Sequence, residues 1–145
     1  MHRFLIAAAL LLGIRVGHAQ GAPPSAEAQA LHEAAEQARR AWFAHDANAL
    51  VADSPRLQVQ LPGADPSAAL EPAQAAALIA DYLASAQEVE TVVRAAREVE
   101  GGRGYVELQR RYRVSGTQDV RSQSLLLGYR QGRSGWLLVE LRVVG

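Results

Sequence analysis

The sequence predicts an α+β domain, with N-terminal helices packed on one face of a curved, mainly antiparallel sheet. Apolar residues recur at helical spacing in the first half of the chain. The residues from 104 onward instead alternate between apolar and polar types, in runs separated by glycine-containing turns. Helices and strands are therefore segregated along the chain, which is typical of α+β domains. A chain of 145 residues suits a single domain of this kind.

Residues 25–45 are predicted to form an amphipathic helix. Ser25 is a suitable N-cap, because its hydroxyl can accept a hydrogen bond from the first turn. The apolar stripe of this helix consists of Leu31, Ala35, Ala38 and Trp42. Asp46 can cap a second, short helix, and Pro72 fits the first turn of a third helix whose apolar stripe includes Tyr82.

The strands are predicted from alternation and turn signals. Residues 56–61 alternate between polar and apolar types, as in a half-buried strand. The runs 104–114, 119–130 and 135–144 predict three more strands joined by hairpin turns. Residues 87–100 are compatible with either a helix or a strand, and the residues alone leave this choice open.

Alternation with a period of two assigns one face of each C-terminal strand to the core. On the first of these strands the inward residues are Val106, Leu108, Arg110, Tyr112 and Val114. On the second they are Leu125, Leu127 and Tyr129, and on the last they are Leu137, Val139, Leu141 and Val143. The same alternation places Leu126, Trp136 and Leu138 on the outer face of the sheet.

Residues 1–19 have the anatomy of a secretory signal peptide, with a basic start, an apolar run over 4–14 and a small residue at position 19. The apolar run is shorter than the ~20 residues that a membrane span needs. We therefore expect cleavage near Ala19-Gln20, export to the periplasm or beyond, and no stable membrane span. Cleavage after Ala22 and an uncleaved anchor are the alternatives. Residues 20–27 are expected to be a flexible segment before a folded domain over 28–145.

The composition excludes several chemistries. The formal net charge is zero, so bulk charge gives no argument for a nucleic-acid partner. The chain has no Cys, which excludes disulfides, thiolate catalysis and Cys-ligated metals. It also has no Lys, which excludes Schiff-base catalysis. No Gly-x-Ser-x-Gly string is present, and the glycines near 132–135 join two strands rather than opening a helix over a phosphate.

Three strings, in this order and spacing, carry a resemblance to a known superfamily. They are residues 42–50 at the helix–helix corner, 72–75 at the start of the third helix, and 135–143 in the last strand. The chain resembles the nuclear-transport-factor-2-like, or cystatin-like, superfamily over about residues 28–144. Ketosteroid isomerase and scytalone dehydratase share that fold. The closest likeness is to short secreted bacterial proteins of unknown function.

The resemblance implies a cone between helices and sheet, in the order α-α-β-α-β-β-β-β, and it makes the ambiguous stretch a strand from near Glu88. Enzymes of the superfamily place a base and an acid inside this cone. Here the polar groups predicted inside it are Tyr82, Arg110, Tyr112 and Tyr129, with no carboxylate. Such a set of donors suits a small anion or polar ligand. In the simpler interpretation each tyrosine hydroxyl reaches a backbone group or the rim, and Arg110 extends out past Tyr112.

The two histidines beyond residue 19 give little evidence for a site. His32 and His45 lie on one predicted helix, about 20 Å apart at 1.5 Å per residue, so they cannot share a metal ion. We expect no metal and no cofactor. His45 adjoins Asp46, but neighbouring helix residues point in different directions. The more economical interpretation is that Asp46 caps the second helix and that His45 has no chemical role.

Three functions are compatible with these observations. The first is a non-catalytic binding or interaction module of the cell envelope, with a small ligand or an envelope protein as partner. The second is an isomerase- or dehydratase-like enzyme for a small hydrophobic substrate. It requires a register slip of one residue, which would turn Glu90 or Glu107 inward. The third is a purely structural dimer with a filled cone.

The outer face of the sheet predicts self-association. Leu126, Trp136 and Leu138 would form an apolar centre inside a rim of Arg and Glu, which is the anatomy of an interface. The resemblance implies the same, since members of the superfamily often dimerise through this face. We expect a homodimer, because two-fold dimers are the commonest oligomers.

Overall fold

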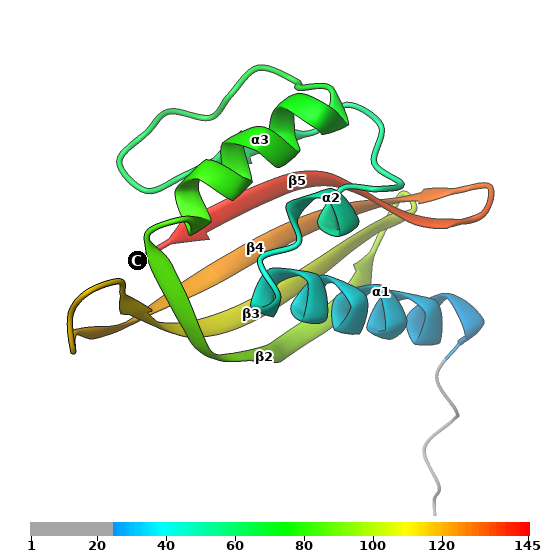
Figure 1. Ribbon diagram of the computed structural model, residues 1–145. Coiled ribbons are helices and arrows are strands. Elements are labelled where there is room, and N and C mark those ends of the chain that lie inside the picture. The colour runs from blue at the N-terminus through cyan, green and yellow to red at the C-terminus, as the bar shows by residue number, and fades with distance from the viewer. Residues whose placement is uncertain (1–24) are drawn as a thin grey trace, which may run out of the picture.

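The structure, a computed structural model, describes residues 25–145 (Figure 1). The predicted signal peptide and residues 20–24 lie outside the described residues. Within them, no helix is both long enough and apolar enough to cross a membrane. The architecture is the predicted α+β arrangement, with helices on one face of a five-stranded mixed sheet.

Three helices form the layer that covers the sheet: α1 (Ala26–Phe43), α2 (Ala47–Leu50) and α3 (Pro72–Leu83). Ser25 caps α1 as predicted, since its hydroxyl accepts a hydrogen bond from the Ala28 amide at 3.1 Å. The stripe predicted for α1 is buried, and Trp42 is only 1% exposed. Pro72 occupies the first turn of α3, where it lacks no helical hydrogen bond.

The sheet contains β1 (Gln58–Gln60), β2 (Ala86–Val99), β3 (Arg103–Val114), β4 (Val120–Gly132) and β5 (Gly135–Val144). Its spatial order is β1-β5-β4-β3-β2, so β2 is an edge strand. Only β1 and β5 pair in parallel. The stretch that the residues left open is thus the strand that the resemblance implied.

Local irregularities in the pairing of neighbouring strands decide which side chains face the helices. The pairing of β2 with β3 shifts between Glu88 and Glu90 and again between Val93 and Ala95. Each shift inserts an extra residue into β2, as in a β-bulge. The pairing of β4 with β5 shifts in the same way beside Gly128. The simple alternation used for the sequence prediction therefore fails on β2 and β5, whereas it holds on β3 and β4.

The shift on β5 corrects one prediction. Leu138 pairs with Tyr129 and is 4% exposed in the core, whereas Glu140 pairs with Gly128. Trp136 also packs against the core, and its indole nitrogen donates to the Glu27 carbonyl of α1 at 3.0 Å. The assignment of Trp136 and Leu138 to an outer dimer interface was therefore wrong. The extra residue at the bulge reverses which face of the sheet the side chains in the first part of β5 point to.

The predicted core is confirmed on β3, β4 and the end of β5, whereas Leu137 and Val139, predicted to face inward, are only partly buried because of the same bulge. It lies between the sheet and α1 and α3. Its largest buried apolar side chains are Leu31, Trp42, Leu57, Ile79, Leu83, Leu108, Leu125, Leu127 and Leu141.

Candidate functional site

The interior of the cone is organised around a buried guanidinium. Arg110 lies on the inner face of β3, as predicted, and its side chain is 1% exposed. It does not extend to the surface past Tyr112, as the simpler interpretation expected. A charge buried to this degree is tolerated only with an opposite charge and hydrogen-bond partners around it.

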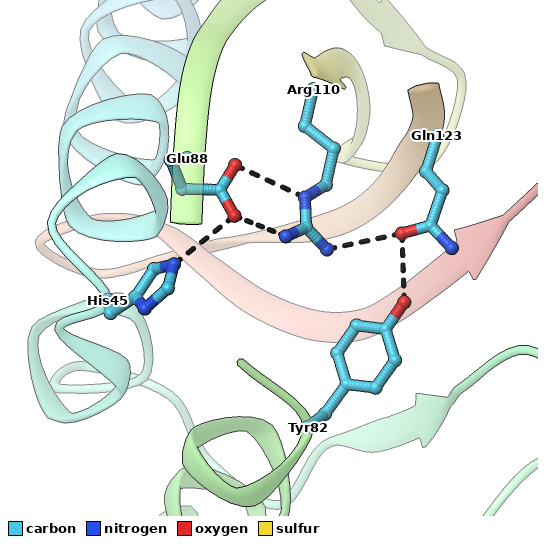
Figure 2. A network of polar contacts seen from close by, with 5 residues as sticks. All are labelled: His45, Tyr82, Glu88, Arg110 and Gln123. Atoms are coloured by element: carbon cyan, nitrogen blue, oxygen red, sulfur yellow. Dashed lines mark hydrogen bonds and ion pairs between the residues drawn. The ribbon is translucent and has the colours of Figure 1, made fainter. Parts of the chain in front are cut away.

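Glu88 of β2 supplies the opposite charge (Figure 2). The Arg110 Nε atom donates to Glu88 Oε2 at 3.2 Å, and Nη2 donates to Oε1. The Glu88 side chain is 2% exposed. The prediction that the cone holds no carboxylate was therefore wrong.

The bulge explains why Glu88 escaped prediction. Glu88 pairs with the inward Tyr112, whereas Glu90 pairs with the outward Arg111, with the extra residue Val89 between them. Two acids that regular alternation would place on one face thus lie on opposite faces. Glu90 and Glu107, the acids considered for an inward position, both face outward.

Gln123 and Tyr82 continue the network from β4 and α3. The Gln123 side-chain carbonyl accepts from Arg110 Nη1 at 3.1 Å and from the Tyr82 hydroxyl at 2.8 Å. Burial raises the pKa of Tyr82, although the Gln123 hydrogen bond and the Arg110 charge act in the opposite direction. Tyr82 therefore acts as a hydrogen-bond donor, and Gln123 links it to the buried guanidinium (Figure 2).

His45 reaches the same network from the corner between α1 and α2. Its Nε2 atom lies 3.2 Å from Glu88 Oε1, and its side chain is 29% exposed. Its backbone has a φ of 56°, in the left-handed region that few non-glycine residues adopt. Asp46 caps α2 as predicted, with Oδ1 accepting from the Ala49 amide at 3.0 Å. The sequence analysis considered only the neighbouring Asp46 as a partner for His45. The carboxylate that His45 contacts is that of Glu88, which lies 43 residues away in the sequence.

Aromatic rings surround the guanidinium. The Arg110 Cζ atom lies 4.0 Å from the centre of the Tyr112 ring, 5.2 Å from that of Trp42 and 5.9 Å from that of Tyr82. Rings at these distances stabilise a cation through their π faces. The structure therefore brings together three of the four predicted cone residues: Tyr82, Arg110 and Tyr112.

Tyr129, the fourth predicted residue, lies elsewhere. It is 6% exposed and borders a small hollow with Ala38, Leu50 and Leu138. Burial raises the pKa of its hydroxyl strongly. It makes no hydrogen bond to the network around Arg110.

The polar groups of this network bind mainly one another. Both oxygens of Glu88 accept hydrogen bonds from the guanidinium, and one also contacts His45. A carboxylate occupied in this way is a poor general base, because a base needs a free lone pair directed at the substrate. Residues 25–145 contain no cluster of three or more His, Asp or Glu that could hold a metal ion.

A second feature lies on the uncovered outer face of the sheet. A cleft of about 390 Å³ extends across β2 to β5. Tyr105, Leu126 and Gly128 line it together with two arginines and two glutamates: Arg97, Arg142, Glu107 and Glu140. Leu126 is therefore on the face where the sequence placed it.

Comparisons with known proteins identify the fold. A ketosteroid isomerase-like protein from Erwinia carotovora atroseptica superposes with a TM-score of 0.66 and 14% identity, over 82% of this chain and 95% of that one. A domain of unknown function with a cystatin-like fold from Nostoc punctiforme gives 0.66 and 16%, over 84% and 78%. A protein with a ketosteroid isomerase-like fold from Catenulispora acidiphila, solved with trimethylamine, gives 0.62 and 13%, over 78% and 85%.

The chain therefore has the nuclear-transport-factor-2-like, or cystatin-like, fold that the sequence resemblance implied. At this level of identity the likeness concerns the fold alone, and the same fold carries many unrelated functions. No protein-family model matches the sequence. No curated protein matches it either.

Proposed function

We propose that this chain is a non-catalytic interaction domain of the cell envelope that acts through the uncovered face of its sheet, with a second copy of itself as the partner. The observation that carries the proposal is the contrast between the two faces. The ionisable groups of the cone bind one another, whereas the outer face has an open cleft with apolar and charged walls.

The state of the cone supports a role without catalysis. Trp42 and Arg110 are each 1% exposed and occupy its centre. Glu88, the carboxylate beside them, is committed to the guanidinium. An enzyme of this architecture would instead need a titratable group with room for a substrate beside it.

The outer face has the composition of an interface. Tyr105 is 44% exposed although it is a large aromatic residue, and Leu126, which lines the same cleft, is half-buried. Arginine and glutamate surround both. An apolar and aromatic centre within a charged rim is what protein–protein interfaces present. Export to the envelope rests on the signal-like segment 1–19 alone.

The experiment is light scattering on protein purified from the secreting cell, at about 20–50 µM, a range that reports micromolar dimers. We expect a dimer for the wild type and a monomer for Leu126→Glu, because that change buries a charge in the interface. Leu78→Glu is the matched control. Leu78 is 37% exposed and lies on α3, in the helix layer on the other side of the molecule. A monomeric wild type, or a dimer unaffected by Leu126→Glu, contradicts the proposal.

The contact between His45 and Glu88 favours one alternative, an isomerase- or dehydratase-like enzyme for a small hydrophobic substrate. A carboxylate that binds one imidazole nitrogen leaves the other nitrogen as a base. His45 is exposed enough to meet a substrate at the rim. The test is turnover of a panel of hydroxy ketones. Loss of activity in both His45→Gln and Glu88→Gln, with folding retained, would favour the enzyme. No turnover by the wild type would count against it.

A further inference from the structure

Two arginines face each other at one end of the outer face of the sheet. Arg103 of β3 pairs directly with Arg130 of β4, and both side chains are exposed. They lie on the outer face, because the neighbouring residues Gly104 and Tyr129 are buried on the inner one. Within residues 25–145, neither arginine forms an ion pair. Two positive charges therefore stand opposite each other on neighbouring strands.

The pattern of backbone hydrogen bonds brings these two side chains close together. The Gln131 amide donates to the Gly102 carbonyl at 2.8 Å, so these two residues are a hydrogen-bonded pair. Such pairs alternate with non-hydrogen-bonded pairs along antiparallel strands, and Arg103 with Arg130 is the next pair along. In a non-hydrogen-bonded pair the Cα atoms lie about 4.5 Å apart and the side chains are closer than in the other kind. Like charges placed directly opposite each other in this way destabilise a sheet.

A third arginine, Arg97, lies diagonally across from Arg103 on β2. Val99 pairs with Arg103, and Arg97 pairs with Tyr105, two residues further along both strands. Diagonal neighbours are about 7–8 Å apart, which long side chains can bridge. Arg97 is exposed on the same face as Tyr105 and forms no ion pair with any described residue. Three guanidinium groups are thus within reach of one point above the sheet.

The acids that the strand pairing places around these arginines do not neutralise them. Glu98 pairs with an inner residue of β3 and therefore lies on the opposite face. Glu140 of β5 lies on the outer face, but its carboxylate contacts Arg142, at 3.4 Å. Glu100 is exposed in the turn that leads into β3 and forms no ion pair in the described part of the chain. The three guanidinium groups are therefore available to an anion from outside the chain.

We propose that Arg97, Arg103 and Arg130 form a binding site for a phosphomonoester group. Guanidinium groups bind phosphate oxygens through paired, charge-assisted hydrogen bonds. A phosphomonoester offers three terminal oxygens and a charge of about −1.5 to −2 at neutral pH, which matches three arginines. The bound dianion attracts Arg103 and Arg130 to one centre and so offsets their mutual repulsion. Inorganic phosphate, a small phosphorylated molecule and the headgroup of phosphatidic acid all present this chemistry.

This site is separate from the cleft through which we propose self-association. Arg103 and Arg130 do not line that cleft, and Arg97 borders both. The Leu126→Glu variant, which we expect to be monomeric, should therefore bind phosphate as the wild type does. Failure of self-association would leave the phosphate site standing, and failure of phosphate binding would leave the proposed function standing.

The first test compares melting temperatures in phosphate and chloride buffers of equal ionic strength. Phosphate should raise that of the wild type, because a ligand that binds the folded state stabilises it. In chloride, Arg103→Gln and Arg130→Gln should melt at least as high as the wild type, since each removes the repulsion, and both should lose most of the phosphate-dependent rise. Arg111→Gln is the matched control. Arg111 lies on the same face of β3 but pairs with Glu90 at 3.5 Å, so this variant should keep the rise.

The second test measures binding directly and distinguishes the sources of the phosphate group. Isothermal titration calorimetry with inorganic phosphate and with glycerol phosphate reports on free ligands. Co-sedimentation with phosphatidylcholine vesicles, with and without phosphatidic acid, reports on the lipid headgroup. Where the wild type binds, Arg103→Gln and Arg130→Gln should each bind at least about tenfold more weakly, whereas Arg111→Gln should bind normally.

Binding in the calorimeter assigns the site to a free phosphorylated molecule, and binding only to vesicles with phosphatidic acid assigns it to the lipid. The proposal is overturned if the wild type binds in neither assay. It is also overturned if Arg103→Gln and Arg130→Gln bind as tightly as the wild type, or if phosphate raises their melting temperatures as much.

Discussion

The buried pair of Glu88 and Arg110 gives the sharpest prediction about stability. Glu88→Gln keeps the shape of the side chain and removes its charge, which leaves the guanidinium, at 1% exposure, without a counter-ion. Breaking a buried ion pair from one side costs about 3–5 kcal/mol, a large part of the total stability of about 5–15 kcal/mol that domains have. At a urea slope of about 2 kcal/mol/M, a loss of 4 kcal/mol moves the midpoint by roughly 2 M.

The assay is urea denaturation followed by tryptophan fluorescence, because Trp42 is buried next to Arg110. Glu90→Gln is the matched control, two residues away on the same strand. Glu90 is 54% exposed and lies 3.5 Å from Arg111, so its loss should cost less than about 1 kcal/mol. Equal costs for the two variants would refute the reasoning. They would mean that Glu88 is solvated and that the bulge does not turn it into the core.

Three further predictions concern single side chains and one concerns processing. Burial raises the pKa of Tyr129 above its ordinary value, so its contribution to stability is full below about pH 10 and is lost as the pH rises beyond that. Alkaline unfolding, followed by circular dichroism, should therefore be weaker in Tyr129→Phe. Trp42→Ala should cost about 3–5 kcal/mol in urea denaturation, and a loss below about 1 kcal/mol would contradict its place in the core. Leu138→Glu should unfold the protein rather than only separate a dimer, as a melting curve would show, because the side chain is 4% exposed in the core. N-terminal sequencing of the exported protein should begin at Gln20, and an intact Met1 would contradict export.

The sequence predicted the parts of the fold that follow a regular period. The stripe of α1 and the inward faces of β3 and β4 were predicted correctly because no residue is inserted in those elements. The regular alternation of β3 predicts the inward position of Arg110 and Tyr112, and the apolar stripe of α3 predicts that of Tyr82. The capping role of Asp46 followed from its chemistry and position alone.

The missed residues share one physical cause. An inserted residue reverses the face of every side chain on one side of it, and this reversal moved Glu88 into the cone and Leu138 into the core. Gly128 in the middle of a strand was the one signal for a bulge in the sequence. Nothing in the local sequence marked the bulge at Val89. The contact of His45 with Glu88 depends on that bulge and on the left-handed corner, so it was also missed.

The irregular edge of the sheet also bears on aggregation. β2 is 14 residues long and ends the sheet, so a regular version of it would offer a continuous row of amide and carbonyl groups to a strand of another molecule. Two bulges interrupt that row, and arginines and glutamates stand on the same strand. Deleting Val89 would remove one of these two bulges and leave Glu88 opposite Tyr112. The inserted Val89 is therefore also one of two interruptions in the sheet edge, where a strand of another molecule would otherwise find a regular row of partners.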